Sequence, residues 1–415
     1  MKPLPANPDV IVVGAGAAGL SAAKALQGRG FEVLVLEADD HVGGRCITDT
    51  STFSTPFDRG GSWMHCAPIN PLARLAEQAG DKLHKAPWDV TWAYADGQSL
   101  TEAEVAEYSL YQDQMWDEIN KAGQGQKDVT VEAALPASRW KDTAKQWTTQ
   151  MHAADADVTS AADVSRFEDA EGDWLVEGGL GAFIKRHHGD VAVRLNCPVS
   201  RIDYSGAGVL VETHQGTVSA GHVVVTVSTG VLAAENIQFH PALPAAKRSA
   251  LEQLPMGLLN KVGFEFDPAW AGAHQGQLLD YGTGGDEFCT ILFGFYETPL
   301  AVGFLAGRFA DQVEAEGEGA ASDYCLGALR DLFGADIDKS IRISSETAWR
   351  GCQHALGSYS YALPHGAGAR EVLGQSVDEK IFFAGEATIP SAYATVHGAY
   401  QSGLKVAADI AAIAG

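Results

Sequence analysis

The sequence predicts a mixed α/β (α+β) fold in which one nucleotide-binding domain is assembled from distant parts of the chain and a second domain is inserted between them. Three observations lead to this prediction. A strand, a glycine-rich turn, a helix and a second strand follow one another near the N-terminus. The C-terminal end returns to a strand and a helix. The segments in between change from a helical to a strand-rich pattern.

The N-terminal unit is built around two apolar runs. The first, "DVIVV" at 9–13, is typical of a parallel strand that is buried on both faces. It leads into "GAGAAG" at 14–19 and then into "LSAAKALQGRG", a helical stretch that stops at Gly28 and Gly30. "FEVLVLEA" is the second strand, so this part of the chain is predicted to form a complete βαβ unit.

The middle of the chain changes character along its length. Residues 70–165 show helical periodicity, including the amphipathic segment "YSLYQDQMWDEINKA", and residues 191–228 contain short strand patterns. More strands follow at 258–310, then a short acidic loop at 314–322 and a helix at 319–333. We therefore expect two interleaved domains. The nucleotide-binding domain would comprise residues 1–76, 179–254 and 352–415, and the inserted domain of mixed sheet and helices would comprise residues 77–178 and 255–351.

The composition narrows the classes of partner. The chain has 415 residues with 29 Lys and Arg against 53 Asp and Glu, a formal net charge of −24. This charge argues against nucleic acid or an anionic membrane as a partner. No apolar run reaches the ~18 residues that a membrane helix needs. The N-terminal segment "MKPLPANPDVIVVG" also lacks the features of a signal peptide.

The six cysteines have neither CxxC spacing nor the spacing of a zinc site. They are Cys46, Cys66, Cys197, Cys289, Cys325 and Cys352. We expect free thiols in a reducing compartment, and hence a cytoplasmic location and no metal site.

The glycine-rich turn has the spacing of a dinucleotide-binding site. Gly14, Gly16 and Gly19 suit a tight turn, close approach of the backbone to a diphosphate, and close packing of helix on strand. The following helix would direct its N-terminal amides at the phosphates. Glu37, at the end of the second strand, would accept hydrogen bonds from ribose hydroxyls. The expected cofactor contacts are Gly14, Ala15, Gly16, Ala18, Gly19, Glu37 and Ala38.

Two further motifs bear on the choice between a nicotinamide and a flavin nucleotide. "ADDHVGGRC" places Gly43, Gly44 and Arg45 directly after the ribose acid, which resembles the signature of FAD proteins of the glutathione reductase type. Arg45 would add a cation beside the diphosphate. Near the C-terminus, "KIFFAGEAT" resembles the second FAD motif of that group, in which Gly385 and Glu386 approach the diphosphate and ribityl chain. Two such motifs at opposite ends of one chain imply FAD.

The whole chain resembles the flavin-containing amine oxidase family of monoamine oxidases, polyamine oxidases and flavin histone lysine demethylases. It is nearest to the polyamine oxidase branch. The segments that carry the resemblance are "GGSWMHCAPINPLARLAEQAG" (60–80), "WLVEGGLGAFI" (174–184), "TVSTGVL" (226–232), "WRGCQHALGSYSYA" (349–362) and "ATVHGAYQSG" (394–403). The resemblance implies a Rossmann-type FAD-binding domain with an inserted substrate-binding domain.

The resemblance also assigns roles to single residues. Further FAD contacts would come from Gly61, Ser62, Trp63, Met64, Val199, Trp349, Thr395 and Val396. A helix that starts near Val396 would direct its amides at the N1/O2 edge of the flavin. Tyr359 would stand on the substrate side, with Thr395 in the place of the second cage tyrosine of monoamine oxidases. Ser358 occupies the position of the cysteine that carries their flavin, so we expect noncovalent FAD.

Lys261 lies in "LLNKVGFEF", which reads as a strand with Val262, Phe264 and Phe266 on one face. The pattern alone would leave Lys261 in solvent on the other face, because lysine is rarely buried. However, "MGLLNKVGFEFDPAW" resembles the family strand whose lysine reaches the flavin N5 through one water. The resemblance therefore predicts that Lys261 is buried beside the cofactor, has a lowered pKa and assists flavin reoxidation.

His65 has two interpretations. A histidine that follows a tryptophan segment is often a packed core residue. In the polyamine-oxidase-like segment, His65 would instead lie in the substrate tunnel and bind a substrate nitrogen. His397 is expected to be structural. The predicted catalytic residues are therefore Lys261, His65, Tyr359 and Thr395.

The family chemistry implies oxidation of the C–H bond next to an amine nitrogen. Hydride passes to flavin N5, the imine hydrolyses, and O₂ is reduced to H₂O₂. The expected substrate is a polyamine or another primary or secondary alkyl amine. Alternatives on the same fold are an L-amino acid oxidase, with Arg308 or Arg350 for the carboxylate, and a carotenoid or porphyrinogen desaturase. A demethylase that works through protein partners is not expected, because no long antiparallel helical insertion is evident. Homodimer formation and the electron acceptor stay open.

Overall fold

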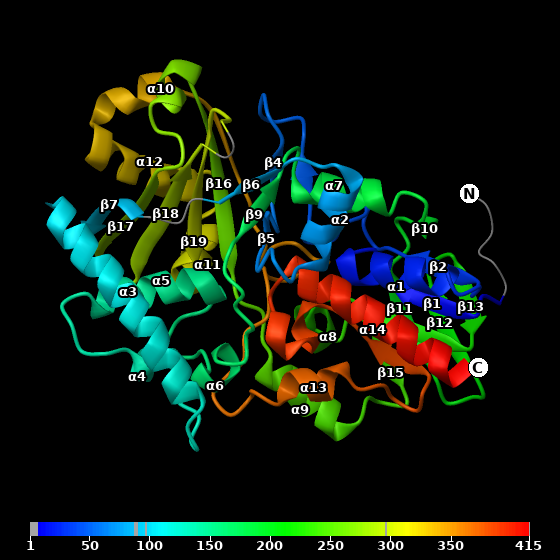
Figure 1. The fold of residues 1–415 in the computed structure, drawn as a ribbon. Coiled ribbons are helices and arrows are strands. Elements are labelled where there is room, and N and C mark those ends of the chain that lie inside the picture. Colours follow the sequence, from blue (N-terminus) through cyan, green and yellow to red (C-terminus); the bar gives the residue numbers. More distant parts are fainter. Residues whose placement is uncertain (1–6, 87–89, 96–97, 295–296, 415) are drawn as a thin grey trace.

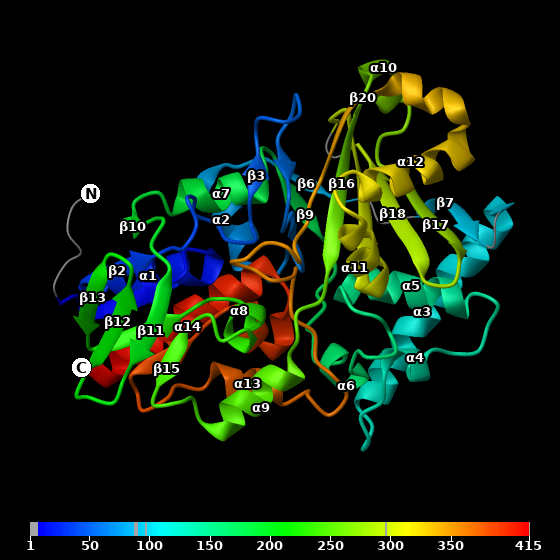
Figure 2. The same cartoon turned by 180° about the vertical axis from the view of Figure 1, so that it is seen from behind.

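Two lobes stand side by side in the structure, a computed structural model that describes residues 7–86, 90–95, 98–294 and 297–414. Figure 1 and its reverse view in Figure 2 show one lobe built on a parallel sheet and the other on a larger, mostly antiparallel sheet. We call them the parallel-sheet lobe and the seven-stranded lobe. The predicted mixed α/β fold is confirmed. The domain limits predicted above, whose first six residues lie outside the described part, stay a prediction.

The parallel-sheet lobe is centred on five parallel strands in the order β10-β2-β1-β14-β21. Their bounds are β1 Val10–Val13, β2 Val33–Leu36, β10 Val193–Arg194, β14 His222–Val225 and β21 Ile381–Phe383. The first two strands come from the N-terminal unit, and β21 comes from the opposite end of the chain. The lobe is therefore complete only when both ends of the chain have met.

Each face of this sheet packs on a different layer, because successive residues of a strand point to opposite sides. Val10, Val12 and Val35 share a core with the helices α1 and α14, which lie against each other. Ile11 and Val13 face a second, four-stranded sheet. The helices of the first layer are α1 Ala17–Gln27, α2 Pro71–Ala79, α7 Leu180–His187 and α14 Val396–Ala414. The other layer contains β11 Val199–Asp203, β12 Val209–Thr213, β13 Gly216–Ala220, β15 Gln238–His240, α8 Thr229–Ala233, α9 Ala245–Gln253 and α13 Ala369–Gly374.

The second lobe is built on a seven-stranded sheet in the order β20-β16-β19-β18-β17-β7-β8. Its strands are β7 Val90–Ala95, β8 Gln98–Ser99, β16 Leu259–Phe266, β17 Leu278–Gly284, β18 Glu287–Phe293, β19 Leu300–Ala306 and β20 Ile341–Glu346. One face packs on helices that follow in the chain, namely α10 Pro268–Gly272, α11 Gly307–Glu316, α12 Ala320–Phe333 and the 3₁₀ helix η1 Ala335–Ser340. A separate helical group adjoins the sheet: α3 Glu102–Gly123, α4 Val131–Ala134, α5 Lys141–His152 and α6 Ala161–Val164.

Short strands occupy the region between the lobes (Figure 1). They form the pair β3 Thr48–Asp49 and β4 Phe57–Asp58, and the three-stranded sheet β5 Trp63–Met64, β9 Trp174–Val176 and β6 Leu83–Lys85. Two 3₁₀ helices, η2 Glu386–Thr388 and η3 Pro390–Ala392, lead into α14. Phe53 and Phe57 pack on residues of the seven-stranded sheet, so this region joins the two lobes through apolar contacts.

Most predicted elements are found, with one correction. "YSLYQDQMWDEINKA" lies within α3, and all six cysteines are free thiols, as expected. The acidic loop predicted at 314–322 is wrong, because residues 314–316 form the last turn of α11 and α12 begins at Ala320. Glutamate and alanine are good helix formers, and the helix ends only at Gly317, whose φ is +107°. No helix among the described residues is long and apolar enough to cross a membrane.

Asp280 is a carboxylic acid in the core of the seven-stranded lobe. It lies in β17 with 0% of its surface exposed. Thr290 on the neighbouring strand donates to it at 2.9 Å and Tyr108 of α3 donates at 3.4 Å. Burial raises the pKa of Asp280 from 3.8 to about 7, because two neutral hydroxyl donors do not replace water around the charged form.

Asp280 should therefore make the stability of the protein fall as the pH rises. The folded form binds a proton that the unfolded form has lost between pH 3.8 and about 7, so this contribution to stability is full below pH 3.8 and lost as the pH rises through 7. Asp280→Asn removes the ionisation and keeps the shape. We expect the variant to be more stable than the wild type at pH 8 by roughly 1–3 kcal/mol.

Urea unfolding at pH 4 and pH 8 measures this effect. Asp113→Asn, on an exposed position of α3, is the matched control and should match the wild type at both values. A difference between Asp280→Asn and the wild type that is the same at pH 4 and pH 8 would contradict a titrating core carboxyl.

Candidate cofactor and active site

In the glycine-rich turn between β1 and α1, two glycines have no room for a side chain, whereas the third faces open space. A Cβ on Gly14 would lie 2.5 Å from the Thr226 hydroxyl, and a Cβ on Gly19 would lie 2.0 Å from the Gly14 carbonyl. Around Gly16, the nearest atom to a Cβ would be the Gly43 carbonyl at 3.8 Å. Gly16 is also the N-cap of α1, with no side-chain cap. The turn thus offers free space beside the first amides of α1, which have no partner within the helix, and this suits an anion.

Glu37 joins this turn to the end of β2. Its carboxylate accepts from the Ala15 amide at 2.6 Å and from the Asp39 amide at 2.9 Å. The Cys197 amide donates to the Glu37 carbonyl at 2.7 Å, which brings the segment that begins β11 at Val199 to the same place. The predicted contacts Ala15, Glu37 and Val199 therefore come together. Ala18 and Ala38 adjoin them in the chain, and the side chain of Ala18 is buried in the core.

The C-terminal motif "KIFFAGEAT" meets Arg45 of the N-terminal motif "ADDHVGGRC" near the C-terminal ends of β14 and β21. Arg45 donates to Glu386 and to the Ser358 carbonyl, each at 2.9 Å. A small cavity adjoins this ion pair, with Arg45, Thr229, Gly385 and Glu386 in its walls. The Thr229 hydroxyl is buried without a hydrogen-bond partner among the described residues. Because such a group costs free energy, these residues fit a polar ligand that carries phosphate and hydroxyl groups.

The N-terminus of α14 approaches the same region. Thr395 caps this helix, since its hydroxyl accepts from the Gly398 amide at 3.0 Å and donates to the Ala392 carbonyl at 2.7 Å. A Cβ on Gly61 would lie 2.5 Å from a methyl group of Val396, so the segment of Gly61 and Ser62 runs directly past the helix start. The structure thus gives Thr395 a capping role that the sequence analysis did not predict.

Lys261 is buried, in agreement with the family resemblance and against the solvent-exposed alternative. It is 3% exposed in β16. Its ammonium donates to the carbonyls of Asp58 at 3.0 Å and Gly60 at 2.5 Å, and to the Ser62 hydroxyl at 2.5 Å. These three acceptors match the three N–H bonds of an ammonium. A further hydrogen bond from Nζ to a water therefore requires one of these contacts to open.

The electrostatics of Lys261 follow from its burial. Desolvation lowers the pKa of the ammonium from 10.5 to about 8, although the nearby carboxyl of Asp58 opposes the shift. The ring of Trp63 lies 5.1 Å from Nζ and that of Phe304 lies 5.8 Å from it. Lys261 is therefore a cation that loses its proton near neutral pH and stands on an aromatic wall.

Several elements hold the carbonyls to which Lys261 binds. The Asp58 carboxylate accepts from the Leu180 amide at 2.9 Å at the start of α7, which fixes β4. The Trp349 indole donates to the Arg59 carbonyl at 3.2 Å. Met64 is fully buried in the core of the parallel-sheet lobe, so its side chain anchors β5. Residues 58–64 are thus fastened from both lobes.

Ser358 and Tyr359 lie in the segment between β20 and α13, which contacts β16 near Lys261. The Tyr359 hydroxyl donates to the Gln150 carbonyl at 3.0 Å. Burial and the charge of Glu386 raise the pKa of this phenol, so it stays neutral. The Ser358 hydroxyl donates to the Leu259 carbonyl at 2.8 Å and accepts from the Leu259 amide at 2.7 Å. Ser358 therefore closes the loop onto β16.

His65 is not the packed core residue of the first interpretation. Its side chain is 36% exposed, and Nδ1 lies 3.0 Å from a carboxylate oxygen of Asp173. A surface recess lined by Lys85, Asp169, Glu171 and Asp173 adjoins this pair. His397 is 4% exposed, and burial together with the charge of His65 lowers its pKa to about 4. A role of His65 toward substrate stays a prediction.

Residues 17–103 and 118–411 match the sequence model of the flavin-containing amine oxidoreductases. The chain belongs to this family. The predicted family, an oxidoreductase that acts on amines and uses a flavin, is thereby confirmed. The curated relatives and solved structures below agree with it, including the predicted likeness to polyamine oxidases.

The relatives come from two groups of the family. Polyamine oxidase 4 of Oryza sativa subsp. japonica is 31% identical, over 96% of this chain and 88% of its own length. Lysine-specific histone demethylase 1 homolog 1 of the same organism is 32% identical, over 97% of this chain. The chain spans about half of that relative's length, 52%.

Solved structures show the same fold over nearly the whole chain. Cyclohexylamine oxidase from Brevibacterium oxydans IH-35A has a TM-score of 0.81 at 26% identity and covers 98% of this chain and 99% of its own. A putrescine oxidase with two substitutions has the same TM-score at 22% identity, with coverage of 98% and 99%. The second likeness concerns the fold alone.

The two arginines considered for an amino acid oxidase are already paired. Arg308 donates to Asp157 at 3.0 Å and lies 3.5 Å from Asp155. Arg350 donates to Asp311 at 2.8 Å and to the Leu356 carbonyl at 3.1 Å. Both guanidiniums therefore already face a carboxylate of the protein itself.

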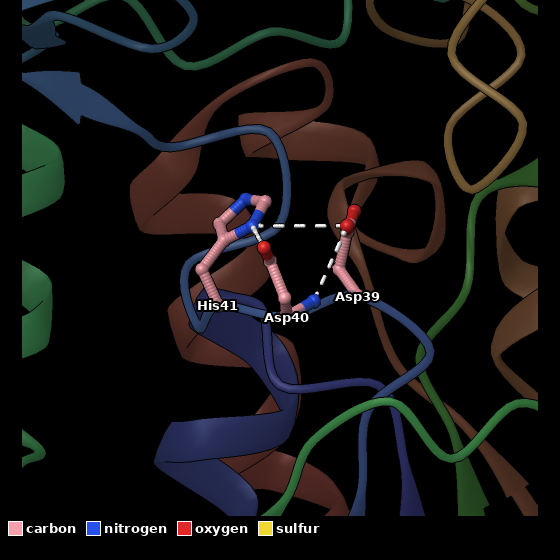
Figure 3. Close-up of side chains that lie close together, drawn as sticks. All are labelled: Asp39, Asp40 and His41. Carbon is pink, nitrogen blue, oxygen red and sulfur yellow. Dashed lines mark hydrogen bonds and ion pairs between the residues drawn. The ribbon is translucent and has the colours of Figure 1, made fainter.

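The loop after Glu37 is where three side chains of metal-binding type gather among the described residues (Figure 3). His41 Nδ1 lies 2.9 Å from a carboxylate oxygen of Asp40 and 3.7 Å from one of Asp39. The three residues are consecutive and at least partly exposed, and pairing of the imidazole with the two acids explains the cluster.

Sequence reasoning missed several residues that hold the site. Asp58 and Gly60 offer only backbone carbonyls to Lys261, which no motif can reveal. Thr229 lies in the quoted segment "TVSTGVL" but received no role. Ser360 follows Tyr359 directly and was likewise passed over. For Thr229 and Ser360 the signal was their place inside segments that already resembled the family.

Proposed function

We propose that the protein binds FAD noncovalently and oxidises a small alkyl amine, of which polyamines are the leading candidates. The observation that carries this proposal is the buried ammonium of Lys261, held on the segment that joins the two lobes. The names of the relatives support it, since polyamine oxidases and a cyclohexylamine oxidase are among them. The cytoplasmic location expected from the free thiols is part of the same proposal.

The proposed FAD contacts divide between the two ends of the cofactor. The turn of Gly14, Gly16 and Gly19 would hold the diphosphate, with Glu37 at the adenosine ribose. Arg45, Gly385 and Glu386 would hold the rest of the diphosphate and the ribityl chain. Gly61, Ser62, Trp63, Trp349 and the start of α14 at Val396 would surround the flavin ring. The engaged hydroxyl of Ser358 supports noncovalent binding, since it offers no thiol for a covalent bond.

When bound, the flavin would accept the hydride from the amine carbon and pass the electron pair to O₂, giving H₂O₂. The protein would supply position and proton control. Lys261, with a pKa of about 8, exchanges a proton at Nζ near neutral pH, and its neutral form has a lone pair that can hold a water. Tyr359 and the methyl group of Thr395 would bound the substrate space, because the Thr395 hydroxyl caps α14.

His65 would bind a second nitrogen of a longer amine. Its partly exposed ring and its pairing with Asp173 suit a cationic or hydrogen-bonding substrate end. The carboxylates of Asp169, Glu171 and Asp173 outnumber the single ammonium of Lys85 in this recess, which would favour cations over anions. This preference agrees with a polyamine and disagrees with an acidic substrate.

Gly16→Ala tests the proposed diphosphate site. The added methyl group meets no protein atom closer than 3.8 Å, so we expect a folded protein. The methyl group would occupy the space of the diphosphate and lower flavin affinity by about tenfold or more. Gly28→Ala, at the end of the same helix and at a φ of −62°, is the control and should retain its flavin.

Acid precipitation followed by chromatography of the supernatant measures the flavin content and identifies the flavin. Released FAD from the wild type and Gly28→Ala, with less from Gly16→Ala, is the expected result. Flavin that remains with the precipitate would contradict noncovalent binding.

Lys261→Met tests the proton-transfer role. Methionine keeps the length of the side chain and removes its donor, so we expect FAD binding with a loss of turnover of about 10²-fold. In the wild type, turnover should rise with pH through about 8 as Nζ loses its proton, and this inflection should vanish in the variant.

Lys247→Met is a closely matched control. Lys247 is also 3% exposed with a pKa lowered to about 8 by burial, but it donates to carbonyls at the end of α13. This control should lose stability and keep the pH inflection. Stopped-flow assigns the loss in Lys261→Met to flavin reduction or reoxidation, and wild-type rates in both would refute the role.

A substrate panel tests the reaction itself. An H₂O₂-coupled assay with spermidine, putrescine, benzylamine and an L-amino acid should give turnover with amines and none with the amino acid, because Arg308 and Arg350 are already paired with acids. Anaerobic bleaching of the flavin by each compound distinguishes a poor oxygen reaction from a poor substrate. Bleaching by the L-amino acid alone would point to the other class.

A further inference from the structure

A buried charge pair links the helical group to the parallel-sheet lobe. Arg370 of α13 is 0% exposed and Asp163 of α6 is 1% exposed. Nε of Arg370 donates to the Asp163 carboxylate at 2.9 Å and Nη2 donates at 2.8 Å. The guanidinium also lies 4.1 Å from the ring centre of Tyr393. No step of the proposed reaction uses either charge.

Arg370 extends to Glu386 through one serine. Nη1 of Arg370 donates to the Ser360 hydroxyl at 2.9 Å, and this hydroxyl donates to the Glu386 carboxylate at 2.7 Å. A guanidinium can only donate. The single proton of the Ser360 hydroxyl is therefore directed at Glu386, and the hydrogen bonds run in one direction along the chain.

Glu386 in turn holds the two segments that bear the predicted substrate-side residues. Its carboxylate accepts from the Ser360 amide at 3.1 Å and from the Ala394 amide at 3.2 Å. Ser360 follows Tyr359 in the chain, and Ala394 precedes Thr395. One carboxylate therefore sets the separation of Tyr359 and Thr395.

Glu386 has to stay charged to do this. Burial raises the pKa of its carboxyl, but the charges of Arg45 and Arg370 and the Ser360 hydroxyl outweigh burial and lower it overall. Arg45 approaches the Glu386 carboxylate from the motif "ADDHVGGRC", and Arg370 approaches it from α13. Each arginine approaches a different oxygen, the latter through Ser360.

The far end of this chain of contacts is firmly placed. The Ser160 hydroxyl caps α6 by accepting from the Asp163 amide at 3.0 Å, and the Ser160 amide donates to the Ala362 carbonyl at 2.9 Å. Figures 1 and 2 both show α6 beside the segment that leads to α13. Asp163 thus offers a fixed partner to Arg370 from outside the parallel-sheet lobe.

We propose that Asp163 and Arg370 are positioning residues that hold Glu386, through Ser360, so that Tyr359 and Thr395 face each other across the substrate space. The inference rests on the proposed function, because it takes Tyr359 and Thr395 as substrate neighbours and Glu386 as a cofactor neighbour. The helices α3–α6 then belong to the active site through this contact, although they lie outside the parallel-sheet lobe.

The stability of a buried ion pair and its positioning role can be separated. Removing one partner leaves an unpaired buried charge and destabilises strongly, whereas replacing both with apolar residues is often neutral. Arg370→Met alone is therefore expected to unfold easily. The double variant Asp163→Leu with Arg370→Met, and the mild variant Ser360→Ala, should remain folded with melting temperatures near that of the wild type.

The experiment measures KM and kcat for the best amine, the visible circular dichroism of the bound flavin, and thermal unfolding. We expect the double variant and Ser360→Ala to raise KM by about tenfold, with a smaller effect on kcat. This change corresponds to the loss of roughly one oriented hydrogen bond. The flavin signal should change in both. Arg330→Met, which breaks the exposed Arg330–Asp338 pair, is the control and should leave all three measurements unchanged.

One outcome would overturn the positioning role, and a different outcome would overturn the proposed function on which it rests. Wild-type KM, kcat and flavin dichroism in Ser360→Ala and in the double variant would leave the pair with a structural role only, and would overturn the proposal. A wild-type enzyme that turns over no amine would overturn the proposed function instead. In that case the flavin dichroism of Ser360→Ala still decides whether the pair positions Glu386.

Discussion

The carboxylate of Glu386 is the interaction on which the arrangement of the candidate site depends. It is 5% exposed, and a charge so deeply buried must be matched by donors on every side. Arg45 reaches it from the N-terminal motif, Ser360 from the loop after β20, and Ala394 from the approach to α14. Three segments that are distant in the chain therefore take their relative positions from one charge.

Lys261 plays the corresponding part on the other side of the interface. Its ammonium is bound by backbone carbonyls of residues 58–60, which ties the seven-stranded sheet to the strands that lead out of the parallel-sheet lobe. The candidate site thus combines a buried anion from one lobe with a buried cation from the other. Backbone carbonyls supply two of the three acceptors of Lys261, whereas Glu386 accepts from two side chains and two backbone amides.

The sequence predicted the elements whose signal is local. Gly14 and Glu37 are separated by one βαβ unit, so spacing alone indicated that they meet, and the Ala15–Glu37 contact bears this out. Lys261 was different, since a half-buried strand and an inward-facing one share the same period-two pattern, and only the family resemblance favoured burial. Asp163 and Arg370 are 207 positions apart and carry no motif, so no sequence pattern could pair them. The capping role of Thr395 was equally hidden, because a threonine before a helix also suits a substrate wall.

The strand order of the parallel sheet has a consequence for how the protein comes to be made. β21 pairs with β14, yet it lies about 160 residues further along the chain, and α14 follows it to cover α1. During synthesis the edge of β14 and the apolar face of α1 therefore stay uncovered until β21 and α14 have left the ribosome. Such long-range pairing folds slowly and leaves a strand edge open to other chains. The segment of β21 and α14 thus completes a layer that β1 and α1 begin, and demand on chaperones should be greatest until that segment has been made.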